Sequence, residues 1–360
     1  MIFLIFAFLL LIPTQLGKFF WFDFSFVQGI RVDYLAVVVY LVDILALLIV
    51  LFGFKKVKWS DWKWWCLFLI LSGVTALEKE VALIGLAKMT LVLMVISVLK
   101  EYKQIRQYLF WIIPIWVFVE VFLGLGQVIL GRSLGGIFYY LGERSFDINT
   151  IGIASISLSG RSFLRAYGTF SHPNSLAGFL VITAYLWQKY KKSYFWWIIW
   201  WLIIMGILLT GSRVAIVAFL LFFARYWGLL LVLLGYFLMK KGVVGGWDVF
   251  SWQKRIDLMK AAIRMFWTYP LFGVGWNNFL KQLPNFSSGR LIQPVHNIFL
   301  LILSQLGIIN SLVLIKALKV LIKKIDWKLF LLIGFLGFFD HYFLTLPQNI
   351  WILAVALILG

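Results

Sequence analysis

The sequence predicts an all-α integral membrane protein. Of its 360 residues, 63% are hydrophobic and only 13% are charged, whereas a soluble domain is about half apolar and about a quarter charged. The apolar residues also fall into long blocks with few charges inside them, such as 34–54. A helix of about 20 such residues crosses the hydrocarbon core of a bilayer. These blocks therefore indicate membrane-spanning helices rather than the interior of a water-soluble domain.

We expect about twelve transmembrane helices in a single membrane domain, 1–360. In chain order the predicted spans are 1–16, 33–54, 62–76, 81–99, 108–130, 174–188, 194–210, 212–225, 227–243, 296–314, 328–344 and 348–360. The first has no basic segment and no small-residue cleavage site, which favours a retained span over a signal peptide. Residues 212–243 are long for one span. We interpret them as two, because a single span would reverse the orientation of everything that follows.

Basic residues in short loops predict the orientation of the spans, because such loops stay in the cytoplasm. Four groups occur: Lys55, Lys56, Lys58 and Lys63; Lys100, Lys103 and Arg106; Lys189, Lys191 and Lys192; and Lys316, Lys319, Lys323, Lys324 and Lys328. All four lie on one side if both termini are cytoplasmic. The external side then receives two longer loops, 131–172 and the large loop 244–295.

Several function classes find no support in the sequence. The net charge of +19 is the topology signal of a membrane protein rather than an indication of nucleic-acid binding. The single cysteine, Cys66, excludes an intrachain disulfide. No H-E-x-x-H, C-x-x-C, D-x-D or nucleotide P-loop pattern occurs, so no metal or nucleotide cofactor is predicted. Asp43 and Glu120 are the acids expected inside spans, and Asp43 is a candidate structural partner of Lys88.

Three predicted helices begin at the external side behind polar residues. They follow S-H-P-N at 171–174, T-G-S-R at 210–213 and Q-P-V-H-N at 293–297. A helix start offers free N–H groups and a partial positive charge, which favours anions. His172, His296 and Arg213 lie at these starts, and His341 falls near the external end of the next span. His172 and His341 also fit as capping or packing residues, and Arg213 also fits as an anchor at the lipid headgroups.

The large external loop contains a predicted amphipathic helix at 252–266. Its apolar face combines Trp252, Ile256, Met259, Ile263 and Phe266, and its polar face combines Gln253, Asp257, Lys260 and Arg264. The same pattern fits a helix that lies on the membrane surface. Arg255 sits at the edge of the apolar face, and we expect it to point inward, toward a buried partner or a ligand.

Four motifs follow one another in the second half of the chain. They are R-A-Y-G-T-F-S-H-P-N at 165–174, T-G-S-R at 210–213, P-L-F-G-V-G-W-N-N-F at 270–279, and H-N-I-F-L at 296–300 with Q-L-G-I at 305–308. In this order, over about residues 160–312, they resemble the bacterial O-antigen ligase/polymerase family of polytopic membrane glycosyltransferases. Ligases, polymerases and protein O-oligosaccharyltransferases share these motifs, so the reaction within the family stays open.

The resemblance implies transfer of a glycan from an undecaprenyl-diphosphate carrier to an acceptor hydroxyl, at the outer face of the inner (cytoplasmic) membrane. It implies no metal ion, nucleotide sugar or other cofactor. Arg213 and His296 match the family's G-S-R and H-N motifs and are the implied catalytic residues. Arg165 and Arg255 match less closely and join Arg213 as implied diphosphate-binding residues. His172 and His341 match no general family feature and are only possible site residues.

This assignment is physically coherent. A diphosphate leaving group needs positive charge where negative charge develops, and the planar guanidinium group suits phosphate oxygens. Histidine, with an ordinary pKa of about 6.5, suits the removal of a hydroxyl proton. One alternative is a polysaccharide or lipid-carrier transporter, which should show related halves with broken helices. Another is a related cell-wall glycan polymerase, which would use a carboxylate of the large loop, Asp248 or Asp257.

Overall fold

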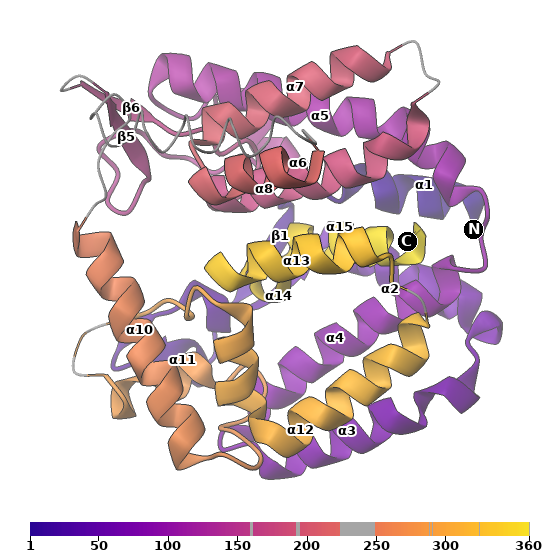
Figure 1. Cartoon of the computed structure of the whole chain (residues 1–360), viewed down its shortest axis with the longest axis vertical. Helices are drawn as coiled ribbons and strands as arrows, with labels where there is room; N and C mark the ends of the chain where they lie inside the picture. Colours follow the sequence, from indigo (N-terminus) through magenta and orange to yellow (C-terminus); the bar gives the residue numbers. More distant parts are fainter. Residues whose placement is uncertain are drawn as a thin grey trace.

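The protein is described by a computed structural model that covers residues 1–158, 161–191, 195–223, 249–287, 289, 291–323 and 325–359. These residues are mostly helical and pack side by side (Figure 1). The helices are α1 (Ile2–Leu11), α2 (Leu41–Gly53), α3 (Lys63–Thr75), α4 (Lys79–Leu99), α5 (Ile105–Leu130), α6 (Pro173–Trp187), α7 (Trp196–Thr210), α8 (Arg213–Phe223), α10 (Val249–Thr268), α11 (Phe279–Gln282), α12 (Ile298–Ile322), α13 (Trp327–Phe339), α14 (Tyr342–Thr345) and α15 (Pro347–Leu359).

Three of the described helices are long and apolar enough to cross a membrane, namely α4, α5 and α12. Five shorter apolar helices accompany them: α1, α7, α8, α13 and α15. The predicted membrane character and all-helical class agree with this result, but the predicted number of spans is not confirmed. The predicted span 227–243 lies outside the described residues, so the two-span interpretation of 212–243 stays a prediction.

Short antiparallel strands occupy two of the links between helices. β1 (Gly17–Phe20) pairs with β4 (Val37–Tyr40), β2 (Phe26–Val27) with β3 (Ile30–Arg31), and β5 (Ser155–Leu158) with β6 (Arg161–Leu164). None of them was predicted, because strands this short show no clear alternating pattern.

The predicted span 33–54 begins later than expected, at Leu41. β-branched residues favour the strand β4 before it, and Asp43 then accepts the backbone N–H of Tyr40 at 3.3 Å, as in a helix-capping turn. Asp43 also accepts the indole N–H of Trp351 at 3.2 Å. Among the described residues these two are its hydrogen-bond partners, rather than Lys88, whose ammonium lies 5.8 Å from the centre of the Tyr40 ring.

The four predicted basic groups meet at one end of the helices. Lys323 pairs with Asp61 at 2.8 Å, Lys328 donates to Gln188 at 2.7 Å, and Lys189 donates to the carbonyl of Leu359, at the end of α15, at 2.6 Å. In Figure 1 both termini lie toward this end, on the right, whereas α10 and the β5–β6 hairpin lie at the opposite end. The fold therefore separates the basic loops from the links that carry the other motifs.

This separation predicts a labelling pattern. Replace Cys66 and introduce a single cysteine at Ser287, next to α11, or at Lys103, in the exposed link between α4 and α5. We expect an impermeant thiol reagent on intact spheroplasts to label Ser287→Cys only, because basic loops stay in the cytoplasm. Permeabilised cells serve as the control in which both cysteines are labelled. Labelling of Lys103→Cys in intact cells would mean that the predicted orientation is reversed.

Two of the sequence motifs meet at a break in α12. Gly307 leaves the helical conformation with φ 60° and ψ −163°, and the segment 270–275 crosses the chain there. Val274 and Gly275 donate to the carbonyls of Ser304 and Gln305, and Ile308 and Ile309 donate to those of Pro270 and Leu271. These hydrogen bonds replace the helical ones that are lost at the break, because backbone N–H and C=O groups at membrane depth must be paired within the protein. A Cβ on Gly273 would lie 2.3 Å from the carbonyl carbon of Gln305, so glycine permits this crossing.

The predicted amphipathic helix is present as α10, but it packs through a different face. Its buried side chains are Leu258, Ala261, Ala262 and Met265, which join a second core with the β2–β3 hairpin and the start of α12. Within the predicted apolar face, Trp252 and Ile263 are 50% and 42% exposed. The small alanines allow close approach to the protein, so the bulkier stripe faces outward.

Candidate active site

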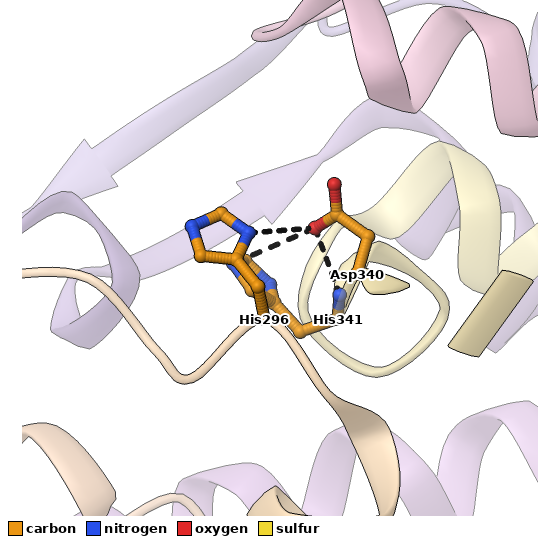
Figure 2. A group of neighbouring side chains, drawn as sticks. All are labelled: His296, Asp340 and His341. Atoms are coloured by element: carbon orange, nitrogen blue, oxygen red, sulfur yellow. Dashed lines mark hydrogen bonds and ion pairs between the residues drawn. The ribbon is translucent and has the colours of Figure 1, made fainter. Parts of the chain in front are cut away.

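His296 is positioned by the residue that follows it. Asn297 caps α12 by accepting the N–H of Leu300 at 2.9 Å, and its amide donates to the carbonyl of Phe338 at 3.0 Å. The cap therefore ties the start of α12 to the end of α13. This contact brings His296 beside Asp340, with 3.2 Å between Nδ1 and Oδ1 (Figure 2). The His296 side chain is 18% exposed, so the imidazole is reachable from outside.

Asp340 is a buried carboxylate with further hydrogen bonds. Oδ1 also accepts the backbone N–H of His341 at 2.9 Å, and Oδ2 accepts the amide of Asn174 at 3.0 Å. Three donors therefore face the carboxylate: the ring of His296, the backbone N–H of His341 and the amide of Asn174. Hydrogen bonds of this kind favour the ionised carboxylate, so Asp340 can accept the Nδ1 proton of His296.

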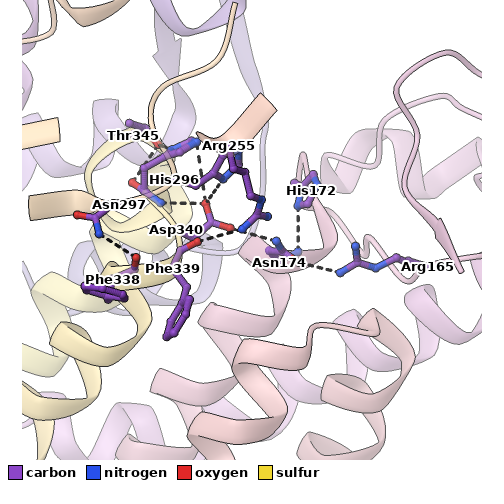
Figure 3. Close-up of polar contacts among 11 residues, drawn as sticks. Arg165, His172, Asn174, Arg255, His296, Asn297, Phe338, Phe339, Asp340 and Thr345 are labelled. Atoms are coloured by element: carbon purple, nitrogen blue, oxygen red, sulfur yellow. Dashed lines mark hydrogen bonds and ion pairs between the residues drawn. The ribbon is translucent and has the colours of Figure 1, made fainter. Parts of the chain in front are cut away.

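A relay of polar side chains connects Asp340 to Arg165. The Asn174 amide that donates to Asp340 also accepts from Nη2 of Arg165 at 2.7 Å (Figure 3). Nε of Arg165 donates to the carbonyl of Thr210, the last residue of α7, at 2.5 Å. Burial lowers the pKa of Arg165 to about 10, which leaves its guanidinium charged at neutral pH.

Two further predicted arginines lie near this relay. α7 ends at Thr210, its cap residue Gly211 lies in the left-handed region with φ 60°, and α8 begins at Arg213, two residues after Gly211. Arg255, on α10, donates to the carbonyl of Phe339 at 3.5 Å, next to Asp340 (Figure 3). The positive charges of Arg213 and Arg255 both lower the pKa of Arg165. The fold therefore brings three arginines, from three separate segments, near one another, and two of them have contacts that lead to Asp340: Arg165 through Asn174, and Arg255 through the carbonyl of Phe339.

The link that carries Arg165 is held in place by α5. Gln127 accepts the N–H groups of Tyr167 and Gly168 at 3.0 and 2.9 Å, and donates to the carbonyl of Gly168 at 2.9 Å. Glu120 accepts the backbone N–H and the hydroxyl of Thr169 at 2.9 and 2.8 Å. The acid predicted inside a span thus has structural partners, and it fixes the backbone from which Arg165 extends.

The two histidines predicted as possible site residues differ in their contacts. His172 caps α6, with Nδ1 accepting the N–H of Asn174 at 3.1 Å. Burial and the charge of Arg165 lower its pKa to about 3. The structure thus gives His172 the capping role that was expected as the alternative to a functional role. His341 is buried beside Asp340, with Nδ1 2.7 Å from the hydroxyl of Thr345, and burial lowers its pKa to about 4. Both histidines are neutral at neutral pH.

The sequence analysis missed two residues of this site. Asp340 was not predicted, although it is the sole acid between residues 327 and 359. An acid alone in so apolar a stretch is itself a functional signal. Asn174 was not predicted as a site residue either, but it bridges Arg165 and Asp340, while His172 caps the helix.

This arrangement offers three chemical abilities. The His296–Asp340 pair can take up a proton, and the arginines can bind an anion. In the described part of the chain, His296, Asp340 and His341 also form a group whose ligand atoms lie within 4.8 Å of one another, as binding of a metal ion requires.

Comparison with known proteins gives one family match. No curated protein matches the chain. Residues 174–315 match the model of the O-antigen ligase family. This segment begins at Asn174, the second residue of α6, and contains Arg213, α10, the break in α12 and His296. Over these residues the chain is similar to the O-antigen ligase family, and the match supports the resemblance that the motifs indicate.

Proposed function

We propose that the protein is a membrane glycosyltransferase that moves a glycan from a polyprenyl-diphosphate carrier to an acceptor hydroxyl. The reaction takes place at the external face of the cytoplasmic membrane. The observation that carries this proposal is the His296–Asp340 pair, which Asn174 connects to Arg165. A proton acceptor and a cation suited to phosphate are thus joined by one chain of hydrogen bonds, which supports transfer from a diphosphate.

His296 acts as the general base. Its Nδ1–H donates to Asp340, so Nε2 carries the free electron pair and takes the proton of the acceptor hydroxyl. The acceptor oxygen bonds to the anomeric carbon of the glycan while the bond from that carbon to the diphosphate oxygen breaks. Asp340 holds the ring in the correct tautomer and stabilises the imidazolium that forms, which is the role of the acid in a Ser-His-Asp triad.

The arginines stabilise the departing diphosphate. Arg213, with Arg165 and Arg255, places positive charge where the leaving group gains negative charge. Arg165 uses two of its five N–H groups in its contacts with Thr210 and Asn174, which leaves others for phosphate oxygens. Guanidinium groups fill the place that a divalent ion takes in other phosphate-binding sites, so the reaction needs no metal and no cofactor.

The location of the site suits a lipid-linked donor. Residues 131–172 and 244–295 are the two external loops of this proposal. They contain Arg255, on α10, and Arg165, directly after β6, and both elements lie at the end of the helices opposite to the chain termini (Figure 1). A polyprenyl chain stays in the bilayer while its diphosphate reaches the membrane surface, where the arginines lie. The acceptor is a hydroxyl of a glycan, a lipid or a protein.

Arg213→Lys tests the donor-binding part of the proposal. Lysine keeps the charge but loses the planar fork, and a hydrogen bond to a charged group contributes about 1.5–3 kcal/mol. We therefore expect transfer from a purified polyprenyl-diphosphate glycan to fall about 10- to 100-fold, and Arg213→Ala to be weaker still.

Arg264→Lys is the matched control, because this arginine of α10 donates to the carbonyl of Phe286, away from His296. It should retain wild-type transfer. EDTA should leave the wild-type rate intact. Full activity of Arg213→Ala would refute the assignment of the donor site, and loss of wild-type activity in EDTA would refute metal independence.

A further inference from the structure

We propose that His296, Asp340 and His341 form a zinc-binding site, and that zinc bound there inhibits the transferase. The binding part stands on the contacts of these three residues alone. The inhibitory part rests on the function proposed above, in which His296 is the base. The sequence predicts none of this, since no metal-ligand spacing occurs in the chain.

The three ligand atoms already lie close to zinc geometry. Tetrahedral zinc with bonds of about 2.0–2.1 Å holds its ligand atoms about 3.3 Å apart. Nδ1 of His296 is 3.2 Å from Oδ1 of Asp340, and Nε2 of His341 is 3.9 Å from the same oxygen (Figure 2). All three ligand atoms lie within 4.8 Å of one another. Side-chain movements on the order of 1 Å would therefore complete the set and leave one position open for water. Two imidazoles and a carboxylate are typical zinc ligands.

His341 is oriented for a metal by its second ring nitrogen. The hydroxyl of Thr345 donates to the backbone carbonyl of His341 at 3.2 Å, so its oxygen accepts the Nδ1–H of the same residue at 2.7 Å. The proton of the neutral ring is therefore on Nδ1, and Nε2 carries the lone pair, 3.9 Å from Oδ1 of Asp340. Two electron-rich atoms at this distance in a buried place favour a cation between them. A hydrogen-bonded outer nitrogen is the usual arrangement of histidine ligands.

Zinc at this position removes the base. In the transfer reaction His296 keeps its proton on Nδ1, toward Asp340, and accepts a second proton at Nε2. When zinc binds Nδ1, the ring changes tautomer through exchange with solvent. It loses the proton at Nδ1, gains one at Nε2 and stays neutral. No lone pair then remains for the hydroxyl of the acceptor. The partial exposure of His296 gives the ion an entry path.

Zinc titration of the full-length protein tests the binding part. The protein is purified with a histidine-free tag, and zinc is measured in competition with a chromophoric chelator. We expect one ion per chain. Thr345→Val removes the hydroxyl that accepts from Nδ1 of His341 and donates to the carbonyl of the same residue, but it leaves all three ligands in place. It should weaken binding about 10- to 100-fold, and His341→Ala should weaken it at least as much. His172→Asn is the control, because asparagine keeps the helix cap, and its zinc affinity should equal that of the wild type.

Activity tests the inhibitory part. Zinc should stop transfer at the concentration at which it binds, EDTA should restore it, and Mg²⁺, which prefers oxygen ligands in octahedral geometry, should have no effect. Thr345→Val should need about 10- to 100-fold more zinc for inhibition. A wild-type protein that binds no zinc, or that binds equally well without His341, would overturn the site. Full activity of the zinc-loaded enzyme would overturn the inhibition. If no transfer is measurable at all, the proposed function fails while the titration still decides whether the site exists.

Discussion

Replacing His296 with glutamine is expected to lower the rate of glycan transfer by about 10²- to 10⁴-fold, the usual contribution of a general base. Glutamine can donate its amide hydrogen to Asp340, as Nδ1–H of His296 does across 3.2 Å. It cannot accept a proton near neutral pH. The variant should therefore be nearly as inactive as His296→Ala, while it still binds the lipid-linked donor through the arginines.

Both quantities can be measured on the purified protein, with single-turnover transfer for the chemical step and photocrosslinking for donor binding. His172→Asn is the matched control at another histidine on the same end of the helices. It keeps the cap of α6, so it should retain most of the activity. Recovery of most of the rate in His296→Gln would mean that His296 positions the acceptor by hydrogen bonding and does not remove its proton.

Local patterns in the sequence predicted the residues that lie at helix starts. His296 and Arg213 stand next to such starts, and the chemistry of a start can be deduced from a few consecutive residues. The partner of His296 could not be deduced in this way. Asp340 is 44 residues away, and the pair forms only because the cap residue of α12 donates to the end of α13.

The two faces of α10 show a second limit. Periodicity selects the bulkiest apolar stripe as the buried one, but hydrophobicity alone does not distinguish a face that packs on protein from one that faces outward. Here Ala261 and Ala262 pack inside, and Trp267 is 72% exposed. The small side chains of Ala261 and Ala262 let the backbone of α10 approach the rest of the protein closely, and this contact determines which face of α10 is buried.

The motif that contains Gly273 shows a third limit. In the sequence it is recognisable only as one of the four motifs that resemble the family, with no structural role. Its role depends on Gly307, in another part of the chain, because each glycine leaves room for the backbone of the other segment. A contact of this kind has no signature in either segment alone. The sequence therefore identified the motif but not the structure that it builds.

Replacing Asp340 with asparagine is expected to lower kcat by about 10²- to 10⁴-fold, with little change in donor binding. The amide has the same shape as the carboxylate, but it cannot accept from His341, Asn174 and His296 at once, because one of its two terminal atoms is a donor. Even where its oxygen still accepts from His296, the neutral amide holds the Nδ1 proton less strongly than a carboxylate, and the imidazolium formed during transfer loses its counter-charge.

Asp326→Asn is the control that separates this effect from simple destabilisation. Asp326 caps the other end of α13, and asparagine is an equally good cap. It also accepts from the hydroxyl of Tyr185 at 2.6 Å, so its replacement perturbs a comparable buried contact. We expect Asp326→Asn to retain kcat, even if both variants unfold at a lower temperature in detergent. A kcat of Asp340→Asn within about tenfold of the wild-type value would show that the carboxylate does not act through His296. A large fall in kcat with unchanged donor binding would assign Asp340 to the step in which the proton moves.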